Sequence, residues 1–388
     1  MEWKEVRLGD VCSELSDGLH KAPKFIVNGE YIFVNAKNLY NGYILDNDPT
    51  KKTSHEEYLK YKKPLGKHSI LYSIDGTIGN IAKYRGEKCV LGKGACYINC
   101  NPEIVESSYL YYQLQSPHFK SYIHLMSTGS TIKHISLKTM RDYVFELPSL
   151  EDQRHIASIL SSLDRKIELN NKINADLEEM AQAIFKNWFV DFEPFKDGKF
   201  VDSELGMIPE GWKVGSLGDF CNVFTGKKNT NQAIEKGSYP FFSCAPEPLA
   251  SNDAIFNGKA IIIAGNGSYT GRTSFYNGGF DLYQRTYACT IREQDKENLM
   301  IFFYHMMKQF FEPVKMGGTR GSSIPYIVMG DITQQKFPYS KDWLIRFSNI
   351  ANSMMDRKLR IDKENSRLSL LRDTLLPRLM SGELEVPE

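Results

Sequence analysis

The stretch WKEVRLGDVC at residues 3–12 returns as WKVGSLGDFC at residues 212–221. Both copies hold Trp-Lys at the start, Leu-Gly-Asp in the middle and Cys at the end. Further landmarks follow in the same order in both halves: Gly76–Gly79 and Gly267–Gly271, Tyr109–Gln113 and Ile301–His305, Gly129–Thr131 and Gly318–Arg320, Leu147–Pro148 and Phe337–Pro338, and Asp164–Lys166 and Asp356–Lys358. Motifs that recur in one order predict two copies of one folded unit.

The segments between these landmarks differ in length and sequence, and the second half is the shorter one. A shared framework with divergent loops is typical of two domains that have one fold and different targets. We therefore expect two globular domains that do not bind the same ligand.

Each globular part is followed by a stretch with apolar residues at seven-residue spacing. The first stretch has no Gly or Pro, and the second has no Gly and no Pro before Pro377. In the first seam, one row contains Ile156, Leu163, Asn170, Leu177 and Ile184, and a second row contains Ile159, Ile173 and Met180. In the second seam, one row contains Phe347, Met354, Ile361, Leu368 and Leu375, and a second row contains Ile350 and Leu371. This spacing predicts two long helices of roughly 45–50 Å that pack against each other. A pseudo-two-fold repeat requires them to be antiparallel.

Asn170 occupies a seam position where an apolar residue is expected. One interpretation is a polar residue tolerated in a frayed or solvated part of the seam. The other is a buried amide that fixes the register of the helix pair.

The predicted fold class is α/β in the broad sense (α+β), with two globular domains, a coiled coil of two long antiparallel helices and a pseudo-two-fold internal repeat. The predicted division of the chain is 1–149 for the first domain, 150–190 for the first long helix, 191–211 for a turn-rich connector, 212–340 for the second domain and 341–382 for the second long helix.

Composition favours a globular protein in a reducing cytoplasm. Of 388 residues, 41% are hydrophobic and 24% charged, and no apolar run approaches the ~18 residues that a membrane span needs. The N-terminus lacks a signal-peptide pattern, and seven cysteines without framework spacing indicate free thiols. Residues 1–149 and 212–340 each carry a net charge of +3, whereas residues 150–211 carry −6. A domain of charge +3 should bind DNA weakly alone, so a partner has to contribute.

Enzyme motifs are absent from the sequence. Gly265-Asn266-Gly267 follows an apolar stretch, but the next glycine is Gly271 and another strand-like stretch comes after it, so a hairpin is expected instead of a dinucleotide loop. Gly226-Lys227-Lys228 lacks the Ser or Thr of a phosphate-binding loop. Neither an adenine methyltransferase motif nor a serine nucleophile elbow occurs.

Three cysteines and one histidine have side chains that could serve a metal site or catalysis. Cys89, Cys96 and Cys100 lack a fourth zinc ligand at normal spacing, and His134 has no acidic neighbour in the sequence. We therefore expect no catalysis, no cofactor and no metal in this chain.

Taken together, these features resemble the specificity subunit of type I restriction–modification systems (the HsdS family). The resemblance covers essentially the whole chain and rests on the order and duplication of short motifs. They are Ile70–Ser73 with its glycine turn, Leu147–Gln153 before the first helix, Ala183–Phe192 at its end, Pro209–Trp212 at the start of the second half and Leu375–Gly382 at the end of the second helix.

The resemblance implies that each globular part is a target-recognition domain that reads one half of a bipartite, asymmetric site in double-stranded DNA. The helices would act as a spacer and as the dock for two methyltransferase subunits, which would carry S-adenosylmethionine. Endonuclease/translocase subunits would join with ATP and Mg, and no membrane would be involved.

Candidate DNA contacts are polar and cationic residues in loops that also contain glycine. In the first domain they are Lys21, Lys37, Asn38, Thr77, Asn80, Lys83, Ser130, Thr131, Lys133 and His134. In the second they are Lys227, Lys228, Asn229, Asn266, Ser268, Tyr269, Arg272, Thr319, Arg320, Ser322 and Ser323. The strongest candidates lie in the loops at residues 129–136 and 317–325.

Two other functions fit parts of the sequence. A scaffold protein would use the paired helices for association and the globular parts to bind proteins. A fused restriction–methylation enzyme would need motifs that the sequence lacks. Retention of a bipartite DNA sequence distinguishes the specificity subunit from the scaffold.

Arg320→Ala tests whether the second glycine loop reads a base. If the guanidinium pairs with a guanine, specific binding should weaken by about 1–3 kcal/mol, whereas binding to random DNA should change little. Binding titrations on specific and random duplexes measure both. Equal losses would assign Arg320 to a phosphate, and no loss would remove it from the interface.

Overall fold

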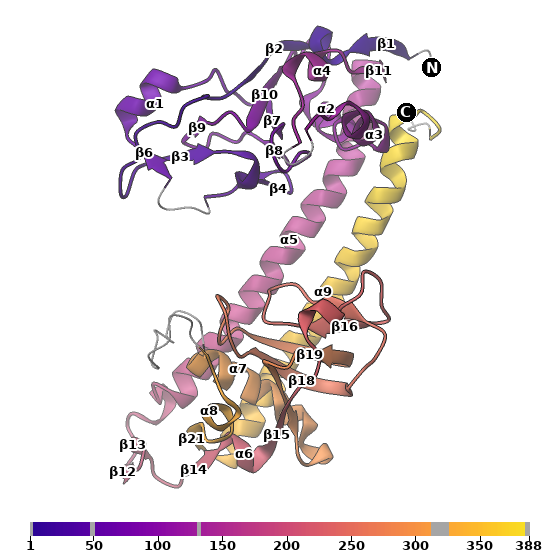
Figure 1. Ribbon diagram of the computed structural model, residues 1–388. Helices are drawn as coiled ribbons and strands as arrows, with labels where there is room; N and C mark the ends of the chain where they lie inside the picture. Colours follow the sequence, from indigo (N-terminus) through magenta and orange to yellow (C-terminus); the bar gives the residue numbers. More distant parts are fainter. Residues whose placement is uncertain (1–2, 47–50, 130–132, 312–325, 385–388) are drawn as a thin grey trace. The chain divides into compact units, whose positions relative to one another are not determined.

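The structure is a computed structural model, and it describes residues 3–46, 51–129, 133–311 and 326–384. The chain divides into unit 1, residues 1–169 and 364–388, and unit 2, residues 170–363. Each unit therefore contains one globular part and about half of each of the two 40-residue helices α5 (Leu150–Phe189) and α9 (Lys341–Met380) (Figure 1). Among the described residues, no helix is both apolar enough and long enough to cross a bilayer.

Unit 1 is built on short, mainly antiparallel strands. They are β1 (Lys4–Arg7), β2 (Cys12–Asp17), β3 (Tyr31–Val34), β4 (Leu39–Tyr40), β5 (Tyr43–Ile44), β6 (Lys52–Thr53), β7 (Ser69–Ser73), β8 (Ile81–Lys83), β9 (Cys89–Leu91), β10 (Ala95–Cys100) and β11 (Val144–Leu147). The shorter helices are α1 (His55–Tyr61), α2 (Ser107–Gln113), α3 (Pro117–Met126) and α4 (Leu137–Arg141). The main sheet has the order β2-β10-β7-β8, and a second sheet has the order β6-β3-β9.

Unit 2 has the strands β12 (Phe200–Ser203), β13 (Gly206–Pro209), β14 (Lys213–Ser216), β15 (Cys221–Thr225), β16 (Tyr239–Phe242), β17 (Leu249–Ser251), β18 (Phe256–Ala264), β19 (Thr273–Leu282), β20 (Thr286–Ile291) and β21 (Lys336–Tyr339). Its shorter helices are α6 (Leu217–Phe220), α7 (Met300–Phe311) and α8 (Met329–Thr333). The main sheet has the order β15-β20-β18-β19-β16-β17.

The two globular parts share one topology. The order β2-β10-β7-β8 in unit 1 corresponds to β15-β20-β18-β19 in unit 2. The order β9-β3-β6 then corresponds to β19-β16-β17, because the long strand β19 occupies the places of both β8 and β9. In unit 1, β3 pairs in parallel with β9 and antiparallel with β6. In unit 2, β16 pairs in parallel with β19 and antiparallel with β17. The predicted internal repeat and the mixed α and β class are confirmed.

Within each unit the two long helices run antiparallel. In unit 1, Ile156 and Leu160 near the start of α5 share an apolar cluster with Leu379 near the end of α9. In unit 2, Phe185 near the end of α5 has its ring centroid 5.6 Å from that of Phe347 near the start of α9. The antiparallel arrangement predicted from the repeat is confirmed in both units.

Each predicted seam has a second row of apolar residues, which includes Met180 on α5 and Leu371 on α9. In the structure the buried row lies one residue later on each helix. Met180 is 53% exposed and Leu371 is 46% exposed, whereas Leu160 and Ala181 on α5 and Ala351 on α9 are buried. The prediction was wrong at this position because apolar side chains occur on both sides of the first seam. The helix that packs against α5 decides which of them is covered.

Asn170 is buried, with 1% of its surface exposed, so the interpretation as a solvated residue is wrong. A nearby amide on the same helix, Asn174, donates a hydrogen bond of 2.6 Å from Nδ2 to Oδ1 of Asp362 on α9. Buried amides therefore interrupt the apolar seam near the middle of α5. This position is consistent with a role in fixing the register.

The thiols considered for zinc lie within the core of unit 1. Cys89 belongs to a different apolar cluster from Cys96 and Cys100, so the three side chains do not converge. Burial raises the pKa of Cys89 and of Cys96 to about 12, which keeps the thiols protonated at neutral pH. Within the described ranges, no three His, Cys, Asp or Glu side chains gather as a metal site.

The cores of the two units differ at one matching polar position. Gln113 on α2 donates a hydrogen bond of 3.0 Å to the Tyr143 hydroxyl, whereas unit 2 has His305, which is 1% exposed. The Nδ1 atom of His305 lies 2.9 Å from Oε1 of Gln182 on α5. Burial lowers the pKa of His305 from 6.5 to about 4, so the ring is neutral in the folded protein at neutral pH.

His305→Gln should make the stability of unit 2 less dependent on pH. The pKa of His305 is lower in the folded than in the unfolded chain, so acid protonates the unfolded chain first. Unfolding free energy on the order of 3 kcal/mol should therefore be lost as the pH falls from 6.5 to about 4. Denaturant unfolding across this range should show a shallower loss in the variant. His20→Gln, at an exposed position, is the control, and equal pH slopes in all three proteins would contradict the prediction.

Candidate nucleic-acid interface

In unit 1, a glycine turn meets the loop that precedes α4. The turn joins β7 to β8 with Gly76 at a φ of 72° and Gly79 at 103°, which is the left-handed region that glycine adopts without strain. The Gly76 N–H donates a hydrogen bond of 3.0 Å to the carbonyl of Lys133. Thr77 and Lys133 are exposed on either side of this contact. We call residues 76–79 with Lys133 and His134 the unit 1 turn surface.

Unit 2 has the same arrangement at the matching place. The turn joins β18 to β19, with Gly267 and Gly271 both at a φ of 85°. The N–H of Ile327, before α8, donates a hydrogen bond of 2.8 Å to the Gly265 carbonyl. We call residues 265–271 the unit 2 turn surface, where Ser268 and Tyr269 are exposed. The expected hairpins, without a dinucleotide loop, are confirmed.

A cationic pocket adjoins the unit 1 turn surface. Lys120 and His124 from α3 and Lys133 from the loop line it together with Asn80 and the turn glycines. Lys120, His124 and Lys133 are all exposed, so the pocket presents their side chains to solvent. Neither Lys120 nor His124 was among the residues predicted from the sequence to contact DNA. Their i,i+4 spacing, which places both on one face of a helix, is the signal that could have found them.

An acidic side chain orients the histidine of the unit 1 turn surface. The Oδ1 atom of Asp75 lies 2.5 Å from Nδ1 of His134, and its Oδ2 atom lies 3.9 Å from the Lys93 ammonium. The prediction that His134 lacks an acidic partner was wrong, because β7 brings Asp75 beside the loop. Asp75 fixes the ring and partly neutralises this edge of the pocket.

Comparison with known proteins identifies the family. The family model described as "Type I restriction modification DNA specificity domain" matches residues 1–179 and 209–341. These two matches cover most of the chain and contain both glycine turns. The chain belongs to this family.

Two relatives and one solved structure illustrate the similarity. The chain is 28% identical to the type I restriction enzyme MjaIX specificity subunit of Methanocaldococcus jannaschii, over 94% of this chain and 86% of that protein. It is 33% identical to the EcoDI specificity subunit of Escherichia coli, over 46% of this chain and 40% of that protein. The fold is similar to the crystal structure of the type I restriction-modification S subunit from M. genitalium, with a TM-score of 0.57, 17% identity and coverage of 98% and 96%.

Membership of the specificity family gives the chain a role in DNA sequence specificity and makes it a non-catalytic subunit. The absence of enzyme motifs in the sequence agrees with this role. The family is also consistent with a chain that carries no cofactor of its own.

Three of the predicted DNA contacts in unit 1 have their side chains engaged inside the protein. Asn38 is 3% exposed and donates from Nδ2 to the Leu45 carbonyl at 3.0 Å. Asn80 donates from Nδ2 to the Ala36 carbonyl at 2.9 Å. The Lys83 ammonium lies 4.4 Å from the Tyr111 ring centroid, and burial lowers the pKa of Lys83 to about 8. These side chains hold loops and strands in place.

Unit 2 uses two of its predicted cationic residues in the same way. The Lys228 ammonium lies 2.7 Å from the buried carboxylate of Asp281 and 2.6 Å from that of Asp253. The Arg272 guanidinium donates to the carbonyls of Ala245 and Pro246. Both cations therefore brace the loops around the unit 2 turn surface.

Two predicted asparagines of unit 2 also bond within the domain. Asn266 accepts a hydrogen bond of 3.0 Å at Oδ1 from the Cys244 thiol, and Asn229 accepts one of 2.7 Å from Gln284. The remaining described candidates are exposed: Lys21, Lys37, Thr77, Lys133, Lys227, Ser268 and Tyr269. Ser130, Thr131, Thr319, Arg320, Ser322 and Ser323 lie outside the described residues.

A close backbone contact explains why Gly226 precedes Lys227 and Lys228, two residues predicted to contact DNA. A Cβ atom on Gly226 would lie 1.7 Å from the Leu282 carbonyl oxygen, and one on the matching Gly18 would lie 2.3 Å from that of Leu91. Only glycine lets the two chain segments approach this closely. In both units this contact fixes where the loop after β2 or β15 leaves the sheet.

Proposed function

We propose that this chain is the sequence-reading subunit of a type I restriction–modification complex and that each globular part reads one half of a bipartite, asymmetric site in double-stranded DNA. The observation that carries the proposal is the single strand order shared by the two units. Two copies of one framework with unlike turns would read two different half-sites. The name of the M. jannaschii relative, a specificity subunit, supports the same role.

The proposal assigns a task to each segment of the chain. Residues 1–149 and 212–340 are the two target-recognition domains, and residues 150–190 and 341–382 are the spacer helices. Residues 191–211 form the connector, which includes the β12–β13 hairpin. Because helix residues from both spacers belong to the core of each unit, the spacers also hold the recognition domains.

The proposed DNA contacts are the exposed residues at and near the two turn surfaces. Thr77, Ser268 and Tyr269 present hydroxyl groups that donate to or accept from base edges. Lys120 and Lys133 present ammonium groups that pair with phosphates, which positions the domain without reading sequence. The side chains that brace the loops, such as Arg272 and Lys228, act by holding these contacts in place.

The chain requires partners for chemistry. In the proposed complex the helices dock two methyltransferase subunits, which bind S-adenosylmethionine and modify adenine. Endonuclease/translocase subunits bind ATP and Mg and cut unmodified DNA. Action on cellular DNA places this complex in the cytoplasm. A net charge of only +3 on each domain is consistent with DNA binding that depends on the methyltransferase partners.

Selection from a randomised duplex pool tests the proposal. The chain, assembled with its methyltransferase partner, should enrich sequences with two short fixed blocks separated by a stretch of arbitrary sequence. DNA sequencing of the retained fraction identifies the blocks. Retention without any enriched bipartite sequence would contradict the proposal and favour a protein scaffold.

Replacing Lys120 and Lys133 together by alanine should weaken binding to all DNA sequences alike. Two phosphate contacts contribute roughly 2 to the slope of log affinity against log salt, so the magnitude of that slope should fall by about this amount. Titrations at several salt concentrations measure the slope. The matched control replaces Lys62 and Lys67, two exposed lysines that do not line the pocket. If both double variants keep the wild-type slope, the pocket does not contact phosphates.

A further inference from the structure

Each unit joins its globular part to the two long helices through a carboxylate. In unit 1, the Tyr112 hydroxyl on α2 donates a hydrogen bond of 2.6 Å to Oδ2 of Asp164 on α5. The other oxygen of Asp164 accepts a hydrogen bond of 2.8 Å from Arg372 on α9. We call these three residues the Asp164 cluster. Three elements from distant parts of the sequence therefore meet at one carboxylate.

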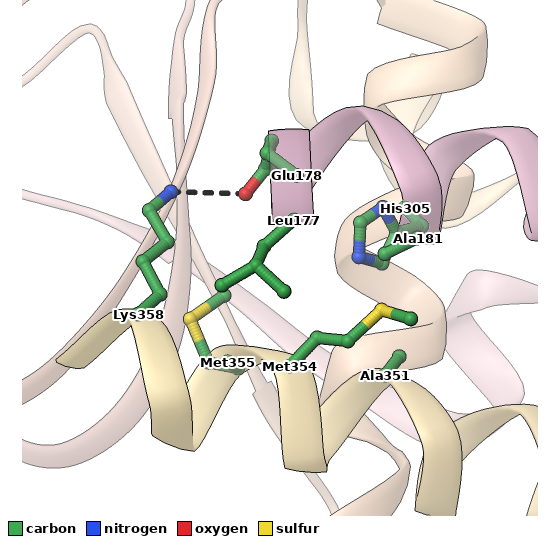
Figure 2. A pocket seen from close by; sticks show the side chains of 8 residues that line it. All are labelled: Leu177, Glu178, Ala181, His305, Ala351, Met354, Met355 and Lys358. Carbon is green, nitrogen blue, oxygen red and sulfur yellow. Dashed lines mark hydrogen bonds and ion pairs between the residues drawn. The ribbon is translucent and has the colours of Figure 1, made fainter. Parts of the chain in front are cut away.

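Unit 2 contains the same arrangement with different residues. The Tyr304 hydroxyl on α7 donates a hydrogen bond of 2.7 Å to Oε1 of Glu178 on α5, and Lys308 on α7 donates to the same oxygen at 2.7 Å. Lys358 on α9 donates to Oε2 at 2.9 Å. Figure 2 shows the Glu178 carboxylate directed toward the Lys358 ammonium. We call these four residues the Glu178 cluster.

The two clusters share the matching tyrosine of the repeat, but both take their carboxylate from α5, although the repeat aligns Asp164 with Asp356 on α9. Tyr112 and Tyr304 are at the same position of the aromatic stretches that recur in the two halves. Asp164 and Glu178 are separated by two heptads on α5, and so are Arg372 and Lys358 on α9. Residues two heptads apart lie on the same face of a helix in a coiled coil. The same connection is therefore made once in each unit from the same faces of the two helices.

The tyrosine donors of both connections are buried, and the Glu178 carboxylate is more buried than the Asp164 carboxylate. Tyr112 is 2% exposed and Tyr304 is 5% exposed. Burial alone would raise the pKa of Glu178, but hydrogen bonds from Lys308 and Tyr304 and the two ammonium charges lower it to about 2. Burial and the adjacent carboxylate raise the pKa of both tyrosines, so their hydroxyls remain donors. The Glu178 cluster is thus a charged acceptor with its donors in place, and in the Asp164 cluster a carboxylate that is about one-third exposed accepts from Tyr112 and Arg372.

The space around the Glu178 cluster is too small for a ligand. Leu177, Ala181, Ala351, Met354 and Met355 surround it with His305, and they leave a cavity of about 10 Å³ (Figure 2). Such a volume holds one water molecule at most. The cluster therefore acts within the protein and not as a binding site.

We propose that the two clusters fix the angle of each recognition domain against the helix pair of its own unit, and that they thereby make the protein select the number of base pairs between the two half-sites. This inference rests on the proposed function. A domain can turn toward a half-site that is one base pair out of place only if its cluster breaks. Breaking it takes the tyrosine donor away from a partly buried carboxylate, which then keeps only its cation on α9, and the loss of that donor is costly.

The size of the effect follows from the bond that is lost. A hydrogen bond to a charged group changes an equilibrium by roughly tenfold or more. The wild-type protein should therefore bind a duplex with the correct spacing at least roughly tenfold more tightly than one with the spacing changed by one base pair. Without the tyrosine hydroxyl, this difference should shrink by up to the same factor. Tyr112 and Tyr304 are positioning residues, since they act through the domain and not on DNA.

Tyr112→Phe and Tyr304→Phe test the inference in the complex assembled with its methyltransferase partner. Each variant keeps the ring and removes only the donor to the carboxylate. Affinity is measured for duplexes that carry the selected half-sites at the selected spacing and at one base pair more or fewer. We expect affinity at the selected spacing to change little, and affinity at the altered spacings to rise by up to roughly tenfold.

The matched control is Tyr109→Phe on the same helix. The Tyr109 hydroxyl is buried and has no hydrogen-bond partner among the described residues, so its removal should leave spacing selectivity unchanged. Hydrogen exchange of the α2 and α7 amides verifies that each variant is folded.

Three outcomes overturn the inference. In the first, the ratio of affinity at the selected spacing to affinity at an altered spacing is unchanged in both cluster variants. In the second, affinity falls equally at every spacing, which would assign the clusters to stability alone. In the third, this affinity ratio falls as much in Tyr109→Phe as in Tyr112→Phe. If the wild-type complex enriches no bipartite sequence, the proposed function fails as well, and the two failures are thus distinguishable.

Discussion

The structure depends on the burial of the apolar seam between α5 and α9. Ile156 and Leu379 close the core of unit 1, and Phe185 and Phe347 close that of unit 2. Neither globular part has a complete core without residues from both helices. This constraint explains why the compact units cut each long helix near its middle, where the five-part division predicted from sequence places no boundary. A helix that belongs to two cores transmits any change of register to both.

The repeat and its hairpins could be predicted because they depend on local features. Glycines at positive φ, such as Gly76 and Gly267, mark turns whatever lies around them. The second seam position could not be predicted, because apolar residues such as Met180 stand beside the residues that are covered. Seam spacing gives the period of the burial pattern, whereas its phase depends on the partner helix.

The candidate interface was predicted in location more than in detail. The turns and loops lie together as expected, but a residue type does not reveal where its side chain points. Arg272 and Lys228 have the charge of DNA contacts and instead hold the domain's own carbonyls and carboxylates. Lys120 was not predicted because it lies on a helix, whereas the predicted contacts are loop residues close to glycine. Tertiary contacts decide which residues line a pocket, and the spacing of residues in the sequence does not reveal these contacts.

The charges of the two clusters are divided between the helices in one direction. The carboxylates of both clusters, Asp164 and Glu178, belong to α5, and the cations that α9 contributes are Arg372 and Lys358. Two α5 helices brought together would place acid against acid, and two α9 helices would place cation against cation. In a polypeptide severed between its halves, these two pairings would favour the association of unlike halves, whereas the ion pair of Lys166 on α5 with Glu364 on α9 has the opposite polarity.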